Sequence, residues 1–370
     1  MSVLILAQGP VEVASSRTRV FAYLPYLERA GIDYELLVWN SGRFIARTLR
    51  GAVPVVEHLR NEAGHARVLA ALLARAGRHE TVYVQKVVLP PWVLGRLKAG
   101  GRRLVFDYDD ALYALAPGQD RGLRAWPRRR RIRRFLRVLD ASDLVVIEND
   151  ENRRVTEAHC PRTLSITGPI DTARYRPAAR APRPEVVLGW VGSPSTTGYL
   201  EMLRPALAEL ARRGHAVRLH LVGASRFESA DVPVRLTPWT LAGEVAALED
   251  FDVGLMPLTD DPWSRGKGGY KLLQYMAMGI PSVASPVGIN DGLLRDGDTG
   301  FLPPTAGDWF EALERLVTDA ALRRAMGARA RDEAVARHSL DHHAPALIDA
   351  LVPGRGGPGA PGGTDRRSRP

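Results

Sequence analysis

Short apolar runs alternate with longer amphipathic stretches along the first half of the chain. The short runs are rich in β-branched residues and end at polar residues or glycine, which is typical of buried strands, whereas the longer stretches have apolar residues at helical spacing. We expect strands at Val3–Ala7, Tyr34–Val38, Val53–Glu57, Thr81–Gln85, Leu104–Phe106 and Leu144–Ile147. We expect helices at Thr18–Ala30, Ala63–Ala76, Pro91–Ala99, Arg128–Leu139 and Glu151–His159.

The alternation fades in the proline-rich segment between Pro161 and Pro184 and then restarts. We expect further strands at Val186–Val191, Val217–Val222, Val234–Thr237, Asp252–Met256 and Ser282–Ala284. We expect further helices near Thr197–Arg213, Leu241–Leu248, Gly269–Met278, Ala306–Val317, Ala321–His338 and Asp341–Leu351. Strands that alternate with helices form parallel sheets covered on both faces, so each half is predicted to be a doubly wound α/β domain.

The predicted organisation is an α/β protein with two Rossmann-like parallel-sheet domains. We expect a first domain at residues 1–170, a linker at 171–184, a second domain at 185–338 and a C-terminal helix at 339–353. Two domains suit a chain of 370 residues, because single cores rarely grow past ~250–300 residues. Residues 354–370 hold six glycines and three prolines with almost nothing to bury, which predicts a disordered tail.

Composition excludes several classes of protein. Hydrophobic residues make up 45% and charged residues 25% of the chain, as in ordinary globular proteins. Cys160 is the only cysteine, which excludes an internal disulfide and a thiolate zinc site, so we expect a reducing cytoplasm. The first residues lack a basic region and resemble a strand more than a signal peptide, and no segment has the ~20 apolar residues of a membrane helix.

The chain is basic, with a formal net charge of +10, yet only four of its 51 basic residues are lysines: Lys86, Lys98, Lys267 and Lys271. The arginine excess is explained by codon usage and a solvated surface, or by attraction to phosphate-bearing partners, and the sequence leaves both explanations open. The scarcity of lysine makes the position of each one informative.

Two of the lysines flank a pair of glycines in the loop after the predicted strand Asp252–Met256. Ligands of parallel sheets bind at the carboxyl ends of strands. Gly268 and Gly269 allow a close approach of the backbone, and the helix that begins near Gly269 favours an anion at its N-terminus. Lys267 and Lys271 would add positive charge, so the loop predicts a diphosphate site; two solvated lysines on a polar loop are the alternative.

Residues 269–302, GYKLLQYMAMGIPSVASPVGINDGLLRDGDTGFL, resemble the donor-site signature of the GT-B glycosyltransferases related to family 4, which retain anomeric configuration. The stretches LGWVGSPSTTGYLEMLRPALAEL at 188–210 and ITGPIDTARYRP at 166–177 are similar to flanking parts of that family. The resemblance implies a GT-B fold, a nucleotide-sugar donor site in the second domain, an acceptor site in the first, and no bound cofactor.

The chain departs from the signature at two carboxylates. Gly266 and Gln274 stand where the family has glutamates that hold the transferred sugar and the nucleotide ribose. Gln274 keeps the capacity to bond a ribose hydroxyl, whereas Gly266 offers only backbone. Ser193 stands in place of a diphosphate-binding arginine, so we expect the donor site to be formed by Gly192, Ser193, Lys267, Gly269, Lys271 and Gln274.

Asp109 and Asp110 stand where the family carries a histidine and an aspartate. With Asp107 they place three carboxylates within four residues, and crowded carboxylates acquire raised pKa values suited to proton handling. We therefore expect Asp109 and Asp110 to be catalytic. The alternative is that one of them caps a helix beginning at Ala111.

Two groups of arginines complete the candidates. Ser16, Arg17 and Arg19 follow the first strand at the expected cleft edge and are candidates for contacts with phosphate or acceptor. A dense run, which includes Arg121, Arg124 and Arg128–Arg137, has Trp126 and Phe135 interleaved. This run is a solvated face, a contact with anionic lipid at the inner membrane face, or a site for a phosphorylated acceptor.

We therefore expect a glycosyltransferase that moves a sugar from a nucleotide-diphosphate sugar to an unidentified acceptor hydroxyl. The missing carboxylates motivate an alternative, a non-catalytic GT-B-like subunit that binds a sugar or nucleotide for a partner enzyme. We do not expect nucleic acid as a partner, because no recognised binding motif accompanies the basic run.

Overall fold

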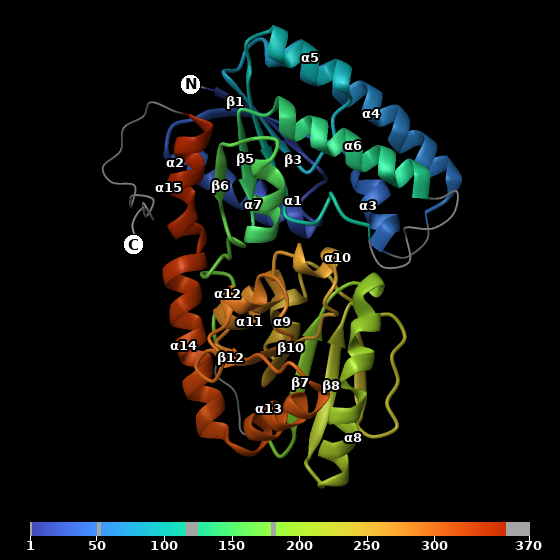
Figure 1. Ribbon diagram of the computed structural model, residues 1–370, viewed down its shortest axis with the longest axis vertical. Helices are drawn as coiled ribbons and strands as arrows, with labels where there is room; N and C mark the ends of the chain where they lie inside the picture. Colours follow the sequence, from blue (N-terminus) through green and yellow to red (C-terminus); the bar gives the residue numbers. More distant parts are fainter. Residues whose placement is uncertain (1, 50–52, 116–124, 179–182, 353–370) are drawn as a thin grey trace, which may run out of the picture.

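The computed structural model describes residues 2–49, 53–115, 125–178 and 183–352. Its described part forms two α/β domains, one above the other in Figure 1, each built on a six-stranded parallel sheet. The prediction of two doubly wound parallel-sheet domains is confirmed. The predicted tail at 354–370, four residues of the predicted linker (179–182), and Arg121 and Arg124 lie outside the described residues.

The first sheet has the strand order β2-β1-β3-β4-β5-β6. Its strands are β1 (Ser2–Ala7), β2 (Asp33–Val38), β3 (Thr81–Gln85), β4 (Arg103–Asp107), β5 (Leu144–Ile147) and β6 (Thr163–Ser165). The connecting helices are α1 (Ala14–Arg19), η1 (Phe21–Tyr23), α2 (Leu24–Arg29), α3 (Gly42–Leu49), α4 (Val55–Ala76), α5 (Pro91–Ala99), α6 (Ala125–Ala141) and α7 (Asp150–Glu157).

The second sheet has the order β12-β11-β10-β7-β8-β9. Its strands are β7 (Val186–Val191), β8 (Val217–Val222), β9 (Val234–Thr237), β10 (Val253–Met256), β11 (Ser282–Ala284) and β12 (Gly300–Phe301). Its helices are η2 (Pro194–Leu203), α8 (Arg204–Arg212), α9 (Glu244–Leu248), α10 (Pro262–Arg265), α11 (Tyr270–Ala277), α12 (Asn290–Leu293), α13 (Ala306–Thr318) and α14 (Ala320–His338), followed by α15 (Leu340–Leu351).

Several predicted elements are wrong in kind or extent. The apolar run at Val53–Glu57 is not a strand, because α4 begins at Val55 with Val55, Val56 and Leu59 exposed instead of buried in a sheet. The helix predicted at Thr18–Ala30 is divided into α1, η1 and α2, with Pro25 in the first turn of α2. The short strands β6 and β12 and the helices α3, α10 and α12 were not predicted, since their periodicity is too short to recognise.

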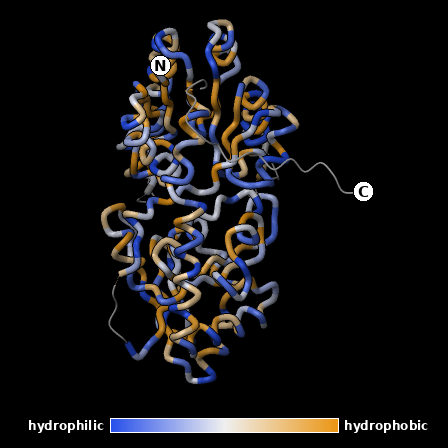
Figure 2. The backbone as a smooth tube through the Cα atoms, turned by 90° about the vertical axis from the view of Figure 1, so that its left-hand side faces the viewer, coloured by the Kyte–Doolittle hydropathy of each residue, from blue (hydrophilic) through white to orange (hydrophobic). Residues whose placement is uncertain are grey.

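Each domain has hydrophobic clusters on both faces of its sheet. Orange, hydrophobic segments accordingly run through both domains in Figure 2. The chain passes between the domains twice, after β6 and after α14, and the two connecting segments lie side by side. Ile170 donates its N–H to the carbonyl of His338 at 2.8 Å, and its carbonyl accepts from the N–H of Leu340 at 3.0 Å. This pairing aligns the segment after β6 with the junction of α14 and α15.

The last described helix, α15, returns to the first domain (Figure 1). Leu340, Ala344, Leu347 and Leu351 pack in one cluster with residues of β1, including Val3 and Ile5. Thr81 Oγ1 donates to the carbonyl of Leu351 at 2.7 Å, and Tyr26 Oη donates to Asp341 at 2.6 Å. The C-terminal helix is therefore part of the core of the first domain, although the second domain precedes it in sequence.

We expect Leu347→Ala to lower the free energy of unfolding by ~2–5 kcal/mol, because Leu347 is 1% exposed and its removal leaves a cavity between α15 and the first sheet. Urea denaturation measures this change. Asp349→Ala, on the exposed side of the same helix, is the control and is expected to change stability by less than ~0.5 kcal/mol. Equal effects of the two substitutions would contradict the packing role of α15.

Candidate functional site

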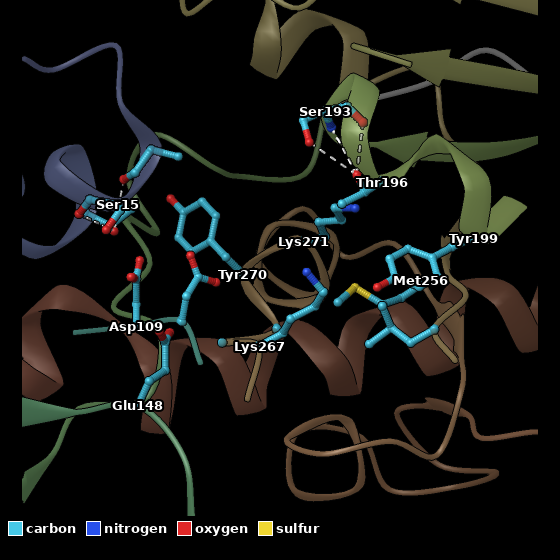
Figure 3. A pocket seen from close by; sticks show the side chains of 16 residues that line it. Ser15, Asp109, Glu148, Ser193, Thr196, Tyr199, Met256, Lys267, Tyr270 and Lys271 are labelled. Carbon is cyan, nitrogen blue, oxygen red and sulfur yellow. Dashed lines mark hydrogen bonds between the residues drawn. The ribbon is translucent and has the colours of Figure 1, made fainter. Parts of the chain in front are cut away.

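A cavity of about 200 Å³ lies between the two domains, at the carboxyl ends of their strands. The first domain contributes residues of α1 and of the loops after β4 and β5, and the second contributes residues of η2, β10 and the start of α11. In Figure 3, Asp109 and Glu148 lie on one side of the cavity, Ser193, Thr196 and Tyr199 lie on the other, and Lys267 and Lys271 lie between them. Acidic and basic groups thus border one space.

The basic part of the cavity is built on the loop that leads into α11. Gly269 has a φ of 66°, in the left-handed region, and stands immediately before the first turn of the helix. The first N–H groups of a helix have no intrahelical acceptor and carry the positive end of its dipole. Lys267 and Lys271 add two ammonium groups at the same helix end, as the sequence predicted.

Neither ammonium has a carboxylate within 4.0 Å among the described residues. Lys271 Nζ lies 4.3 Å from the centroid of the Trp190 ring, and Lys267 Nζ lies 5.4 Å from the Trp263 ring and 5.9 Å from the Tyr199 ring. Burial and the neighbouring Lys267 charge lower the pKa of Lys271 to about 7, and burial also lowers the pKa of Lys267. Asp110 and Asp261 attract Lys267 from beyond 4.0 Å, but among the described residues no carboxylate pairs directly with either cation.

The acidic part of the cavity includes Asp109 and Asp110, the two residues predicted to be catalytic. Both carboxylates pair with the ammonium of Lys86, which is nearly buried. Burial by itself raises the pKa of Asp109, but the Lys86 ammonium outweighs burial and the net pKa lies below the usual value. The alternative role as a helix cap is wrong, since the described residues have no helix beginning at Ala111.

Lys86 is a site residue that sequence reasoning missed, although its rarity was a signal. It follows β3 with a φ of 57°, a left-handed conformation that is unusual for lysine. Its backbone N–H donates to the carbonyl of Asp107 at 2.7 Å, which holds the loop after β3 against the loop after β4. Strained conformations of this kind persist where the surrounding structure fixes them, often at functional sites.

Glu148 is a second residue that the sequence analysis did not identify. It follows β5, lines the cavity and is 4% exposed. Burial, together with the nearby carboxylates, raises its pKa well above the usual value, although Arg19 opposes that shift. No charge pattern in the sequence distinguishes it, because its neighbours Asp150 and Glu151 are ordinary acidic residues of the helix α7.

The structure does not bring Ser16, Arg17 and Arg19 to the cavity wall, where Ser15 and Thr18 lie instead. Ser16 Oγ donates to Gln85 at 3.0 Å, and Arg19 donates to Asp107 and to the carbonyl of Ile166. Arg17 donates to the carbonyl of Val11 and lies 3.6 Å from Glu244 of the second domain. These side chains therefore contact the interior of the first domain and, for Arg17, the second domain. The helix α1 begins at Ala14, four residues before the predicted start.

The other predicted donor-site residues have different positions. Ser193 and Gly269 line the cavity. A Cβ atom at Gly192 would lie 2.9 Å from Lys271 Nζ and 2.2 Å from the Trp190 ring, so glycine makes room for both side chains. Gln274 is 2% exposed, does not line the cavity and donates to Tyr175 Oη at 3.2 Å.

Gly266 faces the first domain instead of the cavity. A Cβ atom there would lie 2.5 Å from the Cβ of Ala111 and 2.8 Å from Tyr113 Oη. A glutamate at this position would therefore separate the two domains as they are packed here.

No group of three or more histidine, cysteine or acidic residues in the described parts of the chain is arranged to hold a metal ion. Over the same residues, no helix has both the length and the apolar character needed to cross a bilayer. The arginine run forms α6, on which Arg129, Arg130, Arg131, Arg133, Arg134 and Arg137 are exposed.

The model of the family "Glycosyl transferases group 1" matches residues 185–319, which cover most of the second domain. A curated relative, D-inositol 3-phosphate glycosyltransferase of Corynebacterium aurimucosum, is 29% identical over 231 residues. The match covers 53% of this chain and 54% of the relative, so this chain spans about half the length of that protein.

Solved structures resemble the whole two-domain arrangement. Sucrose-phosphate synthase from Thermosynechococcus elongatus has a TM-score of 0.73 at 17% identity, with 95% of this chain and 98% of that chain covered. Anabaena HepE in complex with UDP-glucose has a TM-score of 0.62 at 16% identity, with 95% and 99% covered. The fold is that of the GT-B glycosyltransferases, as the sequence resemblance implied.

We expect Lys86→Met to lower the free energy of unfolding by ~3–5 kcal/mol at pH 7, because it leaves Asp109 buried with no ammonium beside it. The loss should shrink as the pH falls toward 4, since the unpaired Asp109 of the variant has a raised pKa and becomes neutral earlier than in the parent. Denaturant titrations at both pH values measure the difference.

Lys98→Met is the matched control for Lys86→Met. The Lys98 ammonium pairs with Asp143 at 2.7 Å, and its side chain is 42% exposed. Exposed pairs contribute ~0–1 kcal/mol, so this control should stay close to the parent at both pH values. A Lys86→Met protein as stable as the control would contradict a structural role for the Lys86–Asp109 pair.

Proposed function

Because the model of the group 1 glycosyltransferases matches residues 185–319, we propose that this chain transfers a sugar from a nucleotide-diphosphate sugar to an acceptor hydroxyl. We propose retention of configuration at the anomeric carbon, as the resemblance of residues 269–302 implies. The donor would bind to the second domain and the acceptor to the first, with transfer in the cavity between them. HepE binds UDP-glucose, which supports a nucleotide sugar as the donor class.

The observation that carries this proposal is the pair of lysines at the start of α11, which have no carboxylate within 4.0 Å in the described part of the chain. Two half-buried ammonium groups and a helix N-terminus together favour a ligand with more than one negative charge, and a diphosphate has this property. During transfer, negative charge builds on the departing diphosphate, and Lys267, Lys271 and the α11 N–H groups are placed to stabilise it. One well-placed group of this kind contributes ~3–4 kcal/mol to catalysis.

Asp109 and Asp110 lie across the cavity from the proposed diphosphate site. Their carboxylates would accept hydrogen bonds from hydroxyl groups of the acceptor or sugar, while Lys86 keeps Asp109 ionised. Ser15 and Thr18 add neutral hydroxyl groups on the same side of the cavity. The first domain thus offers a polar surface suited to a hydroxylated acceptor, as the proposed reaction requires.

Turnover distinguishes the enzyme from a non-catalytic binding subunit. Purified protein is incubated with UDP-glucose, UDP-N-acetylglucosamine, GDP-mannose and related nucleotide sugars, and release of the nucleoside diphosphate is measured. Hydrolysis of one of them above the rate without protein, abolished in Asp109→Asn/Asp110→Asn, supports an enzyme. Tight binding of a nucleotide sugar without hydrolysis, alone or with a panel of acceptors, would support the binding subunit instead.

We expect Lys271→Met to weaken nucleoside diphosphate binding by ~1.5–3 kcal/mol, the value of a hydrogen bond to a charged group. Binding to the parent should weaken as the pH rises through about 7, because Lys271 loses its proton there and a bound anion favours the protonated form. Calorimetric titrations at pH 6 and pH 8.5 measure both effects.

Lys98→Met is the control for this measurement as well, and it should match the parent at both pH values. The diphosphate affinity of the parent should change with pH for two reasons, the titration of Lys271 and the titration of the nucleotide phosphates. In the Lys271→Met protein only the change caused by the nucleotide phosphates should remain. Equal diphosphate affinity of the parent and the Lys271→Met protein would contradict the diphosphate site.

We further propose that α6 binds an anionic surface near the acceptor, such as a bilayer rich in acidic lipid. Among the described residues, the six exposed arginines of α6 have no carboxylate within 4.0 Å, and Arg130 lies over the ring of Trp126, which is 62% exposed. Exposed arginines elsewhere are mixed: Arg212 and Arg226 have glutamate partners, whereas Arg67 and Arg324 have no carboxylate within 4.0 Å among the described residues. What distinguishes α6 is that six such arginines lie on one helix. A helix with uncompensated arginines beside an exposed tryptophan suits an anionic membrane interface.

The quadruple change of Arg129, Arg130, Arg133 and Arg134 to glutamine should abolish sedimentation with phosphatidylglycerol vesicles at low salt. Each arginine near such a surface contributes ~1 kcal/mol. The control replaces Arg212, Arg226, Arg295 and Arg337 by glutamine, which removes the same charge from paired positions and should leave sedimentation intact. Failure of the parent to sediment at low salt would exclude the lipid surface.

A further inference from the structure

Glu148 is a buried carboxyl group in the cavity that nothing in the described part of the chain satisfies. Its side chain is 5% exposed, and no hydrogen bond from those residues reaches its carboxylate oxygens. The nearest cation there is Arg19, whose Nη1 lies 4.0 Å from Oε2, and Arg19 is already paired with Asp107. The carboxyl group lines the cavity, so a ligand in the cavity can supply the hydrogen bonds that the described residues do not.

Two glycines create the space that the Glu148 side chain occupies. A Cβ atom at Gly268 would lie 2.2 Å from both Cδ and Oε2 of Glu148, and one at Gly168 would lie 3.3 Å from Oε1. Any side chain at position 268 would therefore displace the carboxyl group. The neighbouring Asn149 donates to the carbonyl of Lys267 at 3.1 Å, which fixes the loop after β5 against the loop before α11.

This contact places a carboxyl group of the first domain against the backbone that leads into the proposed diphosphate site. In a nucleotide-diphosphate sugar, the sugar is bonded directly to the distal phosphate. With the diphosphate at Lys267 and Lys271, the sugar must lie close to Gly268 and within the same cavity that Glu148 lines (Figure 3). The raised pKa of Glu148 favours its neutral, protonated form, and this form binds a neutral hydroxyl group better than a cation.

Asp109 and Asp110 differ from Glu148 in this respect, since both already contact the Lys86 ammonium. Of these three carboxyl groups, Glu148 is the one that a Cβ atom at Gly268 would meet, at 2.2 Å. We propose, on the basis of the function proposed above, that Glu148 binds a hydroxyl group of the transferred sugar and thereby selects the donor. A sugar with the opposite configuration at that carbon would leave Glu148 unsatisfied and bind more weakly.

The test compares Glu148→Gln with Asp150→Asn, which removes a carboxylate of 98% exposure two residues away. Calorimetry measures the affinity of each protein for UDP, UDP-glucose, UDP-galactose, GDP and GDP-mannose. We expect the parent to bind one nucleotide sugar more tightly than the matching diphosphate. Glu148→Gln should lose roughly tenfold or more of the affinity for that sugar, with the diphosphate affinity changed less than twofold. Asp150→Asn should match the parent.

The selectivity between UDP-glucose and UDP-galactose, or between another pair of epimers, is the readout that a merely structural role would not move. Glu148→Ala is the second variant, and thermal unfolding of both variants shows whether they fold. A ratio of sugar to diphosphate affinity that is the same in parent and Glu148 variants would overturn the inference and leave the proposed function intact. A parent that binds none of these nucleotides would overturn the proposed function and, with it, this role of Glu148.

Discussion

The partial burial of two lysine ammonium groups without a carboxylate within 4.0 Å in the described protein is the constraint on which the site depends. Charged groups are expensive to remove from water, and the cost falls when a counter-ion is supplied. Within the described chain, the contacts of the two ammonium groups are the faces of Trp190, Trp263 and Tyr199, and Asp110 and Asp261 attract Lys267 only from beyond ion-pair distance. The lowered pKa values of Lys267 and Lys271 express that cost, and a bound diphosphate would remove it.

The opposite charge is held across the cavity by the first domain. Lys86 compensates Asp109 and Asp110, and Arg19 compensates Asp107, so the acidic groups are largely balanced inside their own domain. Glu148 is the exception, because its nearest cation is shared with Asp107. The two walls therefore differ in what they lack: the second domain lacks an anion, and the first lacks a partner for one carboxyl group. A nucleotide-diphosphate sugar carries both complements in one molecule.

The close contact of the domains explains why glycine recurs in the loop before α11. Gly266 meets Ala111, Gly268 meets Glu148, and Gly269 takes a left-handed conformation at the helix start. Longer side chains at the first two positions would separate the domains and open the cavity. The absence of the signature glutamate at position 266 is thus compatible with a site in which a carboxyl group is supplied from the other domain.

The alternation of strands and helices that builds two parallel sheets, and the cationic loop at Lys267–Lys271, follow from the sequence itself, although α4 begins where a strand was expected at Val53–Glu57 and β6 and β12 were not predicted. Each of these depends on local periodicity, glycine position or the rarity of lysine, which a single chain displays directly. The tertiary structure alone decided that Arg19 is internal and that Gln274 lies away from the cavity. It alone also decided that Glu148 borders the cavity and that Lys86 pairs with Asp109 and Asp110. These placements depend on which strand ends meet and on how closely two domains pack. Such contacts join residues far apart in the chain, so the local pattern of residues does not predict them.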